Sequence, residues 1–140
     1  MDQSNLNKRQ MSQPEIDVAS FFSFLGINWK YEFPVHVTVQ GLQRVWYPDF
    51  YLPEFGLYVE VCGIEREEYV FREIVYKENC VSVIFLHAYK YDKWPIFLIN
   101  QIKQIEHKRW SIIQNCVHPY LLSVGKNTNS EKIPESVTIL

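Results

Sequence analysis

Two acidic residues mark the stretch "WYPDFYLPEFGLYVEVCG", residues 46–63, as a place where chemistry could occur. Asp49 follows Pro48, and Glu60 lies within the apolar run Leu57–Cys62. A Glu between two valines is unfavourable in a buried strand unless a partner compensates its charge. Two carboxylates that lie close together repel each other, and a divalent cation between them removes that repulsion. The stretch therefore predicts a metal site.

Hard cations suit such a site. Proteins hold Mg²⁺ with one or two carboxylates, and water and substrate phosphate complete its shell of oxygen ligands. We expect Mg²⁺ or Mn²⁺ to be bound by Asp49, Glu60 and the backbone carbonyl of Val61. Pro48 would fix the backbone on the approach to Asp49. In the alternative interpretation, Asp49 is a turn residue that follows Pro48.

The two acids must come from neighbouring strands. Side chains alternate along a strand, so Glu60 and Cys62 share one face of a strand at Leu57–Cys62. Asp49 belongs to a preceding strand at about residues 43–52, and "LPEFG" turns the chain between the two strands. Alternating apolar and polar residues predict an earlier strand at residues 29–39. The short connections favour an antiparallel meander of the three strands.

A helix is expected before these strands. Ser12 and Glu15 form a capping-box pattern, and Gly26 is the expected stop of a helix that ends near Leu25. Glu15 also extends the apolar stripe of this helix. It can therefore either cap the helix with Ser12 or reach the metal site, and the sequence leaves both roles open.

The second half of the chain predicts a helix, a strand and a last helix. The helix at about residues 64–79 is expected to face the sheet with an apolar stripe. This stripe consists of Val70, Phe71, Ile74 and Val75. Residues 80–87 suit a strand that is buried on both faces and runs parallel to the third strand after a right-handed crossover. Asp92 is the expected N-cap of the last helix. The inward stripe of that helix consists of Leu98, Ile99, Ile102 and Ile105.

The order α-β-β-β-α-β-α predicts an α/β (α+β) fold, with a mixed central sheet, helices on its faces and an extra C-terminal helix. A length of 140 residues suits a single domain over residues 1–140. Residues 1–11 and about 123–140 are expected to be flexible tails.

The composition excludes several classes of protein. Hydrophobic residues make up 47% of the chain, which is enough for a globular core. We expect a cytosolic protein, because the apolar runs are too short for a membrane span and the N-terminus lacks a signal-peptide pattern. The three cysteines form no CxxC pair, which argues against a disulfide framework and a cysteine zinc site. A net charge of −2 gives no general affinity for nucleic acid.

The stretch "YPDFYLPEFGLYVEVCG" resembles the core motif of the PD-(D/E)XK nuclease superfamily, which has the restriction-endonuclease-like fold. The family pattern is Pro-Asp, a spacer and then Glu-X-Lys, and Pro48-Asp49, Glu60-Val61 and the following Gly63 match it. The predicted order α-β-β-β-α-β over about residues 12–87 is similar to the family core. The nearest likeness is to small nucleases of the phage, transposon and very-short-patch-repair type.

This resemblance implies a metal-dependent DNA endonuclease that hydrolyses phosphodiester bonds. Asp49, Glu60 and Val61 would hold Mg²⁺ or Mn²⁺, and Glu15 would be the first-helix Glu that assists the metal site. DNA is the implied partner, with RNA or a branched junction left open. Cutting both strands would require a homodimer, two binding events or a larger DNA-processing complex.

Cys62 departs from the family pattern, because the family has its catalytic lysine at this position. In one explanation the role of the lysine has moved, with Lys77 as the preferred substitute ahead of Arg66 and Arg72. In a second, Cys62 itself contacts a softer metal such as Mn²⁺ or Zn²⁺. In a third, catalysis is lost and the nuclease-like module only binds DNA or a protein partner.

Overall fold

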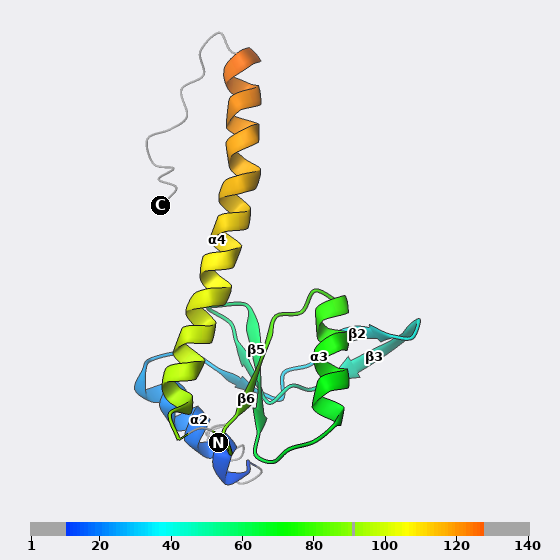
Figure 1. Ribbon diagram of the computed structural model, residues 1–140, viewed down its shortest axis with the longest axis vertical. Helices are drawn as coiled ribbons and strands as arrows, with labels where there is room; N and C mark the ends of the chain where they lie inside the picture. Colours follow the sequence, from blue (N-terminus) through cyan, green and yellow to red (C-terminus); the bar gives the residue numbers. More distant parts are fainter. Residues whose placement is uncertain (1–10, 91, 128–140) are drawn as a thin grey trace, which may run out of the picture. The chain divides into compact units, whose positions relative to one another are not determined.

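The computed structural model describes residues 11–90 and 92–127 (Figure 1). These residues fall into two compact units with a boundary between Ile102 and Lys103. The elements in chain order are α2 (Gln13–Phe24), β1 (Lys30–Tyr31), β2 (Val35–Val39), β3 (Leu42–Trp46), β4 (Phe50–Leu52), β5 (Leu57–Cys62), α3 (Glu68–Glu78), β6 (Val83–His87) and α4 (Trp94–Asn127). The expected class, a mixed α/β fold with an additional C-terminal helix, is confirmed at this level.

A four-stranded mixed sheet in the order β1-β4-β5-β6 forms the centre of the first unit. β5 pairs antiparallel with β4 and parallel with β6, as the sequence predicts. α3 covers one face, because its Tyr76 hydroxyl donates a hydrogen bond of 2.8 Å to Glu60 on β5. α2 covers the other face, where Phe22 contacts Phe50 with 5.6 Å between ring centroids, and Phe50 is the partner of Val59. The core therefore lies on both sides of β5.

The expected meander of three long strands is wrong in one respect, since the first two strands are each divided. β1 pairs with β4 in the central sheet, whereas β2 pairs with β3 in a separate two-stranded ribbon. The pairs Tyr31–Phe50 and Val35–Trp46 are separated by three residues on each side, so both ladders keep one register. Each three-residue interruption contains a proline, which cannot donate to a ladder. The hairpin is therefore continuous in register but broken in its middle.

α2 begins as the sequence predicts. Ser12 donates hydrogen bonds of 2.6 Å from its backbone N–H and from its hydroxyl to Glu15. Gly26 ends the helix with a φ of 71°, a conformation that glycine adopts without strain. Leu25 is exposed, so the buried stripe ends at Phe22. Met11, which was assigned to a flexible lead-in, is buried, and residues 1–10 lie outside the described part of the chain.

The predicted inward stripe of α3 is wrong at three of its four positions. Val70, Phe71 and Ile74 have exposed fractions of 65%, 47% and 50%, whereas Val75 and Tyr76 are buried. The helix is rotated so that polar groups on its inner side meet the Glu60 carboxylate, which is itself buried. A buried charge without partners costs more free energy than aliphatic side chains that stay exposed to water.

β6 and α4 differ from their predictions mainly at their ends. β6 starts at Val83, and its residues alternate between buried and half-buried rather than being buried throughout. α4 starts at Trp94, and the Lys93 carbonyl accepts its first hydrogen bonds, so Asp92 is not the N-cap. Leu98 and Ile102 are buried as expected.

α4 also extends through residues 123–127, which were expected to belong to a flexible tail. Residues 128–140 lie outside the described part of the chain. Within the described residues, none of the helices combines the length and apolar character that a membrane crossing requires.

Candidate metal and phosphate site

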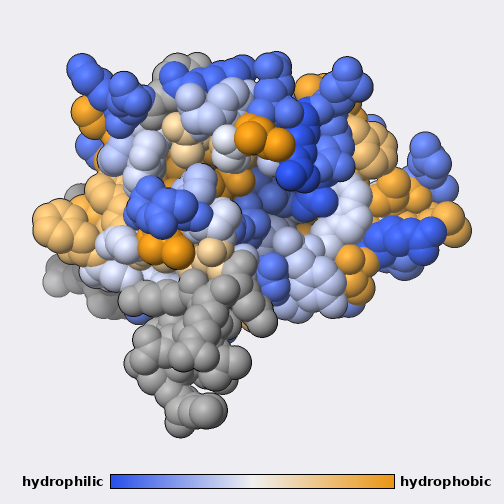
Figure 2. Space-filling view, turned by 90° about the horizontal axis from the view of Figure 1, so that it is seen from below, coloured by the Kyte–Doolittle hydropathy of each residue, from blue (hydrophilic) through white to orange (hydrophobic). Residues whose placement is uncertain are grey.

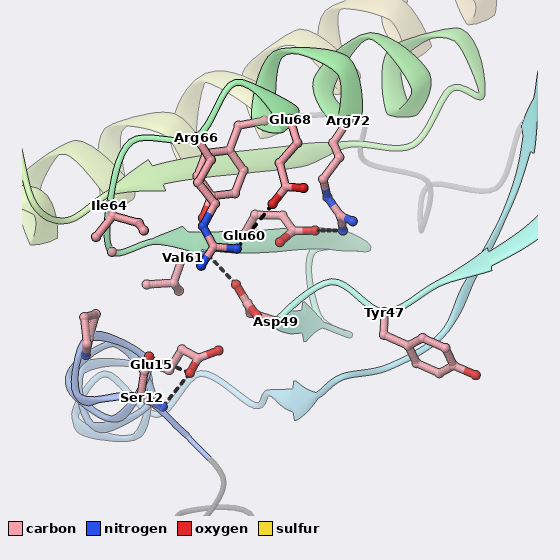
Figure 3. Close-up of a pocket in the computed structure, with 13 residues that line it drawn as sticks. Ser12, Glu15, Tyr47, Asp49, Glu60, Val61, Ile64, Arg66, Glu68 and Arg72 are labelled. Carbon is pink, nitrogen blue, oxygen red and sulfur yellow. Dashed lines mark hydrogen bonds and ion pairs between the residues drawn. The ribbon is translucent and has the colours of Figure 1, made fainter.

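A pocket of about 590 Å³ opens where α2, the break before β4, the end of β5 and the start of α3 meet (Figure 3). Its lining residues are Ser12, Pro14, Glu15, Tyr47, Asp49, Glu60, Val61, Gly63, Ile64, Arg66, Glu68, Tyr69 and Arg72. Figure 2 shows mainly hydrophilic residues around the hollow in the middle of one face. The pocket thus brings together Asp49, Glu60, Val61 and Glu15, as the sequence predicts.

Asp49 owes its position to the break in the hairpin. The Glu32 N–H donates a hydrogen bond of 2.9 Å to the Asp49 carbonyl, which holds the chain between β3 and β4. The Asp49 side chain accepts a hydrogen bond of 2.7 Å from the Val61 N–H, just past the last residue of β5 that pairs with β4. Asp49 is therefore a bridging residue at a strand end and not simply a turn residue.

The pKa of Asp49 is raised to about 8, first by burial and then by the neighbouring charge of Glu60. The hydrogen bond from the Val61 N–H acts in the opposite direction. Glu15 adds to the increase through its charge and a side-chain contact. Burial and the Glu60 charge thus disfavour ionisation of Asp49 in this pocket.

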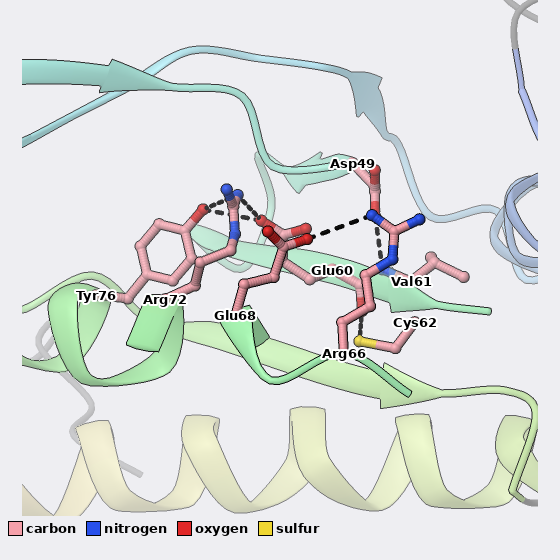
Figure 4. A network of polar contacts seen from close by, with 8 residues as sticks. All are labelled: Asp49, Glu60, Val61, Cys62, Arg66, Glu68, Arg72 and Tyr76. Atoms are coloured by element: carbon pink, nitrogen blue, oxygen red, sulfur yellow. Dashed lines mark hydrogen bonds and ion pairs between the residues drawn. The ribbon is translucent and has the colours of Figure 1, made fainter. Parts of the chain in front are cut away.

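Glu60 is buried, with an exposed fraction of 6%, and it is fully engaged on one oxygen (Figure 4). Its Oε1 accepts hydrogen bonds of 2.5 Å from Arg72 and 2.8 Å from the Tyr76 hydroxyl. Arg72 also donates to the Tyr76 oxygen at 2.9 Å, and its guanidinium lies 4.8 Å from the ring centre of Trp46. This closed network fixes one oxygen of the Glu60 carboxylate.

Glu15 caps α2, as one of its two predicted roles requires, and its carboxylate also lines the pocket. Its Oε2 accepts the two hydrogen bonds from Ser12 at the start of α2. Its Oε1 accepts a hydrogen bond of 3.3 Å from the Tyr31 hydroxyl, and the carboxylate lines the pocket. The helix cap therefore anchors a carboxylate at the edge of the site.

The Val61 carbonyl is a suitable third oxygen. The N–H and C=O of one strand residue point to the same side of the strand. Since the Val61 N–H is directed to Asp49, its carbonyl is directed to the same side. Val61 therefore offers an oxygen beside Asp49.

Two predicted site residues lie away from this pocket. Cys62 is completely buried and does not line it, and burial followed by the charge of Glu60 raises the pKa of its thiol to about 12. A thiol in this state is a poor metal ligand and a poor nucleophile. Lys77 is exposed and does not line the pocket. The rotation of α3 instead directs Arg72 into the site, and the loop before α3 supplies Arg66.

Sequence reasoning missed the network around Glu60. Arg72 and Tyr76 are separated by one helical turn, and Tyr69 lies three residues before Arg72, so the three share one side of α3. This polar and aromatic stripe is the signal in the sequence that indicates the network. Tyr47 lies at the margin of the pocket, and its ring points away from the carboxylates (Figure 3).

The donor set fits a hard cation. Asp49, Glu60 and the Val61 carbonyl provide two carboxylates and one neutral oxygen, the type and number of protein ligands that Mg²⁺ uses. Among the described residues, no three His, Cys, Asp or Glu side chains are arranged to hold a metal by themselves. Water and phosphate oxygens would complete the shell.

Comparison with protein-family models, with curated protein sequences and with solved structures gives no match.

Proposed function

We propose that the protein is a metal-dependent endonuclease that hydrolyses phosphodiester bonds in DNA, and that residues 12–87 form a restriction-endonuclease-like core of the PD-(D/E)XK type. The observation that carries this proposal is the bond from the Val61 N–H to Asp49, which places that carboxylate beside the end of β5. The element order supports the assignment of the core, because the broken hairpin counts as two long strands.

The chain's own residues have distinct tasks in this proposal. Asp49, Glu60 and the Val61 carbonyl would hold Mg²⁺ or Mn²⁺, and Glu15 would contribute through a water molecule. When bound, the cation supplies Lewis-acid activation of the phosphoryl oxygen and a more acidic water. Arg72 and Tyr76 keep the Glu60 side chain in a single orientation. The positive charge that the motif lysine would have provided comes from arginine and not from Lys77.

The alternative is a nuclease-like module that binds DNA or a protein partner without catalysis. It is favoured by the engagement of Glu60 with Arg72, which neutralises this carboxylate without any metal. The buried Cys62 at the lysine position favours it as well.

Metal titration and plasmid nicking separate the two functions. Calorimetric titration with Mg²⁺ and Mn²⁺ and nicking of a supercoiled plasmid would be measured for the wild type, Asp49→Ala and Cys62→Lys. Asp17→Ala is a matched control, because Asp17 is an exposed acid on α2 that does not line the pocket. The endonuclease proposal expects metal binding and nicking by the wild type and by the control, and loss of both in Asp49→Ala.

Two other outcomes favour the module. An inert wild type with an active Cys62→Lys variant would mean that catalysis was lost with the lysine. Absence of metal binding and nicking in every variant would leave only a binding role. A homodimer or two binding events would be needed for double-strand cuts, and the ratio of nicked to linear plasmid reports on this.

A further inference from the structure

Two arginines line the pocket, and they are held very differently. The Arg72 side chain has an exposed fraction of 26% and is held by Glu60, by Tyr76 and by the face of Trp46. The Arg66 side chain is 54% exposed, and its ion pair with the equally accessible Glu68 measures 3.3 Å. Exposed ion pairs contribute only about 0–1 kcal/mol, so Arg66 can change its partner at little cost.

Arg66 also points to the place where a phosphate would bind. Figure 4 shows its guanidinium beside Asp49 and Val61, whereas Arg72 is turned to Tyr76 and Glu60. Arg66 lies in the loop between β5 and α3, and its carbonyl accepts a hydrogen bond from the Tyr69 N–H, so its exposed side chain can move while its backbone stays tied to α3. Guanidinium groups bind phosphate with two parallel hydrogen bonds.

The charges of the pocket require such a movable cation. Its lining contains the carboxylates of Glu15, Asp49, Glu60 and Glu68 and the two guanidinium groups. One bound divalent cation would leave the ionised site neutral, so a phosphodiester would add an uncompensated negative charge. If Arg66 leaves Glu68, the 60% exposed Glu68 side chain is hydrated by bulk water and the guanidinium becomes available.

We propose that Arg66 exchanges Glu68 for the scissile phosphate and is thus the substrate-contacting cation of the site, with Glu68 as its resting partner. This inference rests on the proposed nuclease function. It assigns Arg72 a different role, which is to position Glu60 for the metal.

The two members of the Arg66–Glu68 pair therefore have opposite effects on substrate binding. Arg66→Gln should raise the apparent KM for plasmid cleavage about tenfold or more, because a charge-assisted contact to phosphate is lost. Glu68→Gln should lower the apparent KM about twofold, because Arg66 no longer has a competing partner. Arg66→Lys should restore part of the affinity, since an ammonium group keeps the charge but not the two parallel bonds.

Three measurements make this test specific. Glu67→Gln is the matched control, because it removes the same charge from the neighbouring exposed position, which does not line the pocket. Mn²⁺ affinity should remain within about twofold in Arg66→Gln and fall in Arg72→Gln. Affinity for a short fluorescent DNA duplex, measured with Ca²⁺ in place of Mg²⁺, should follow the same order as the apparent KM.

The outcomes distinguish this inference from the proposed function. If the wild type cuts DNA but Arg66→Gln and Glu68→Gln change the apparent KM in the same direction or not at all, the partner exchange is overturned. The proposed nuclease function then still stands. Equal effects of Glu67→Gln and Glu68→Gln on the apparent KM also overturn the partner exchange, since the effect would then come from the net charge of the region and not from the Arg66–Glu68 pair. A wild type that neither binds metal nor cuts overturns the proposed function and the inference with it.

Discussion

Arg72 on α3 and Glu60 on β5 form an ion pair of 2.5 Å in which the carboxylate is almost completely buried. Removal of one partner from a buried pair leaves an uncompensated charge, which is strongly destabilising. Arg72→Met should therefore lower the free energy of unfolding by about 2–3 kcal/mol, somewhat less than for a fully buried pair because Arg72 is partly exposed. Urea denaturation measures the change.

Arg66→Met is the matched control for stability. Its exposed pair with Glu68 should contribute less than about 1 kcal/mol. The double substitution Arg72→Met with Glu60→Gln should recover part of the loss, because it removes both charges. Equal losses in the two arginine variants would contradict the assignment of Arg72 as the structural partner of Glu60.

The raised pKa of Asp49 predicts how stability changes with pH. With a folded-state pKa of about 8 and an ordinary value of 3.8, the folded protein holds this proton more tightly than the unfolded chain. The contribution of Asp49 is then most favourable below about pH 4, declines as the pH rises and is lost above about pH 8. In EDTA, the free energy of unfolding of the wild type should fall by roughly 1–3 kcal/mol more than that of Asp49→Asn between pH 5 and pH 8.5.

Comparison with Asp49→Asn isolates this effect, because histidines and other acids titrate in both proteins. The variant keeps the shape of the side chain without its ionisation. Parallel stability curves of the two proteins would mean that Asp49 ionises normally.

The three cysteines should differ in reactivity. Cys80 and Cys116 are exposed, whereas Cys62 is buried and the pKa of its thiol is raised to about 12. The cysteine thiolate attacks the disulfide of Ellman's reagent and releases thionitrobenzoate, so the native protein at pH 8 should release two equivalents rapidly and the third only after unfolding. Cys62→Ala should remove the slow equivalent alone. A third rapid equivalent in the wild type would show that Cys62 is accessible and would reopen a role for it at the metal.

The rotation of α3 can be tested with two adjacent aliphatic residues. Val75 is buried and Ile74 is half exposed, although the sequence pattern placed both on the inner stripe. Val75→Ala should lower the free energy of unfolding by about 2 kcal/mol, whereas Ile74→Ala should lower it by less than about 1 kcal/mol. Chemical denaturation of both variants provides the comparison. Large losses in both variants would favour the orientation predicted from the sequence.

Local patterns were sufficient for much of the fold. The bounds of β5, the cap of α2 at Ser12 and the parallel pairing of β5 with β6 follow from alternation, capping chemistry and the helix between two strands. The break in the first hairpin was not predicted as a change of sheet. Proline reveals where a ladder is interrupted, but the sheet that each half then joins depends on distant packing.

The site was predictable where it depends on one strand and its neighbour. Asp49 and Glu60 were recognised because short connections bring adjacent strands together. Arg72 was missed because the rotation of a helix depends on the side chains of the sheet that it faces. The ion pair between the buried Glu60 carboxylate and the Arg72 guanidinium stabilises this rotation more than burial of the apolar stripe would stabilise the other.

The break that separates β1 and β4 from β2 and β3 leaves the ribbon in a sheet of its own, while the base of the ribbon packs on α3 through Val35 and Val37. Both ladders share one register, and Asp49 is fixed on the near side of the break by Glu32 and Val61. Residues can therefore be added in opposed pairs at the tip of the ribbon, beyond the pair Val39–Leu42, without displacing the acid, whereas a single unpaired insertion would shift the register of the ladder. The length of the tip can thus vary while the contacts of the ribbon base with α3 and the position of Asp49 are kept.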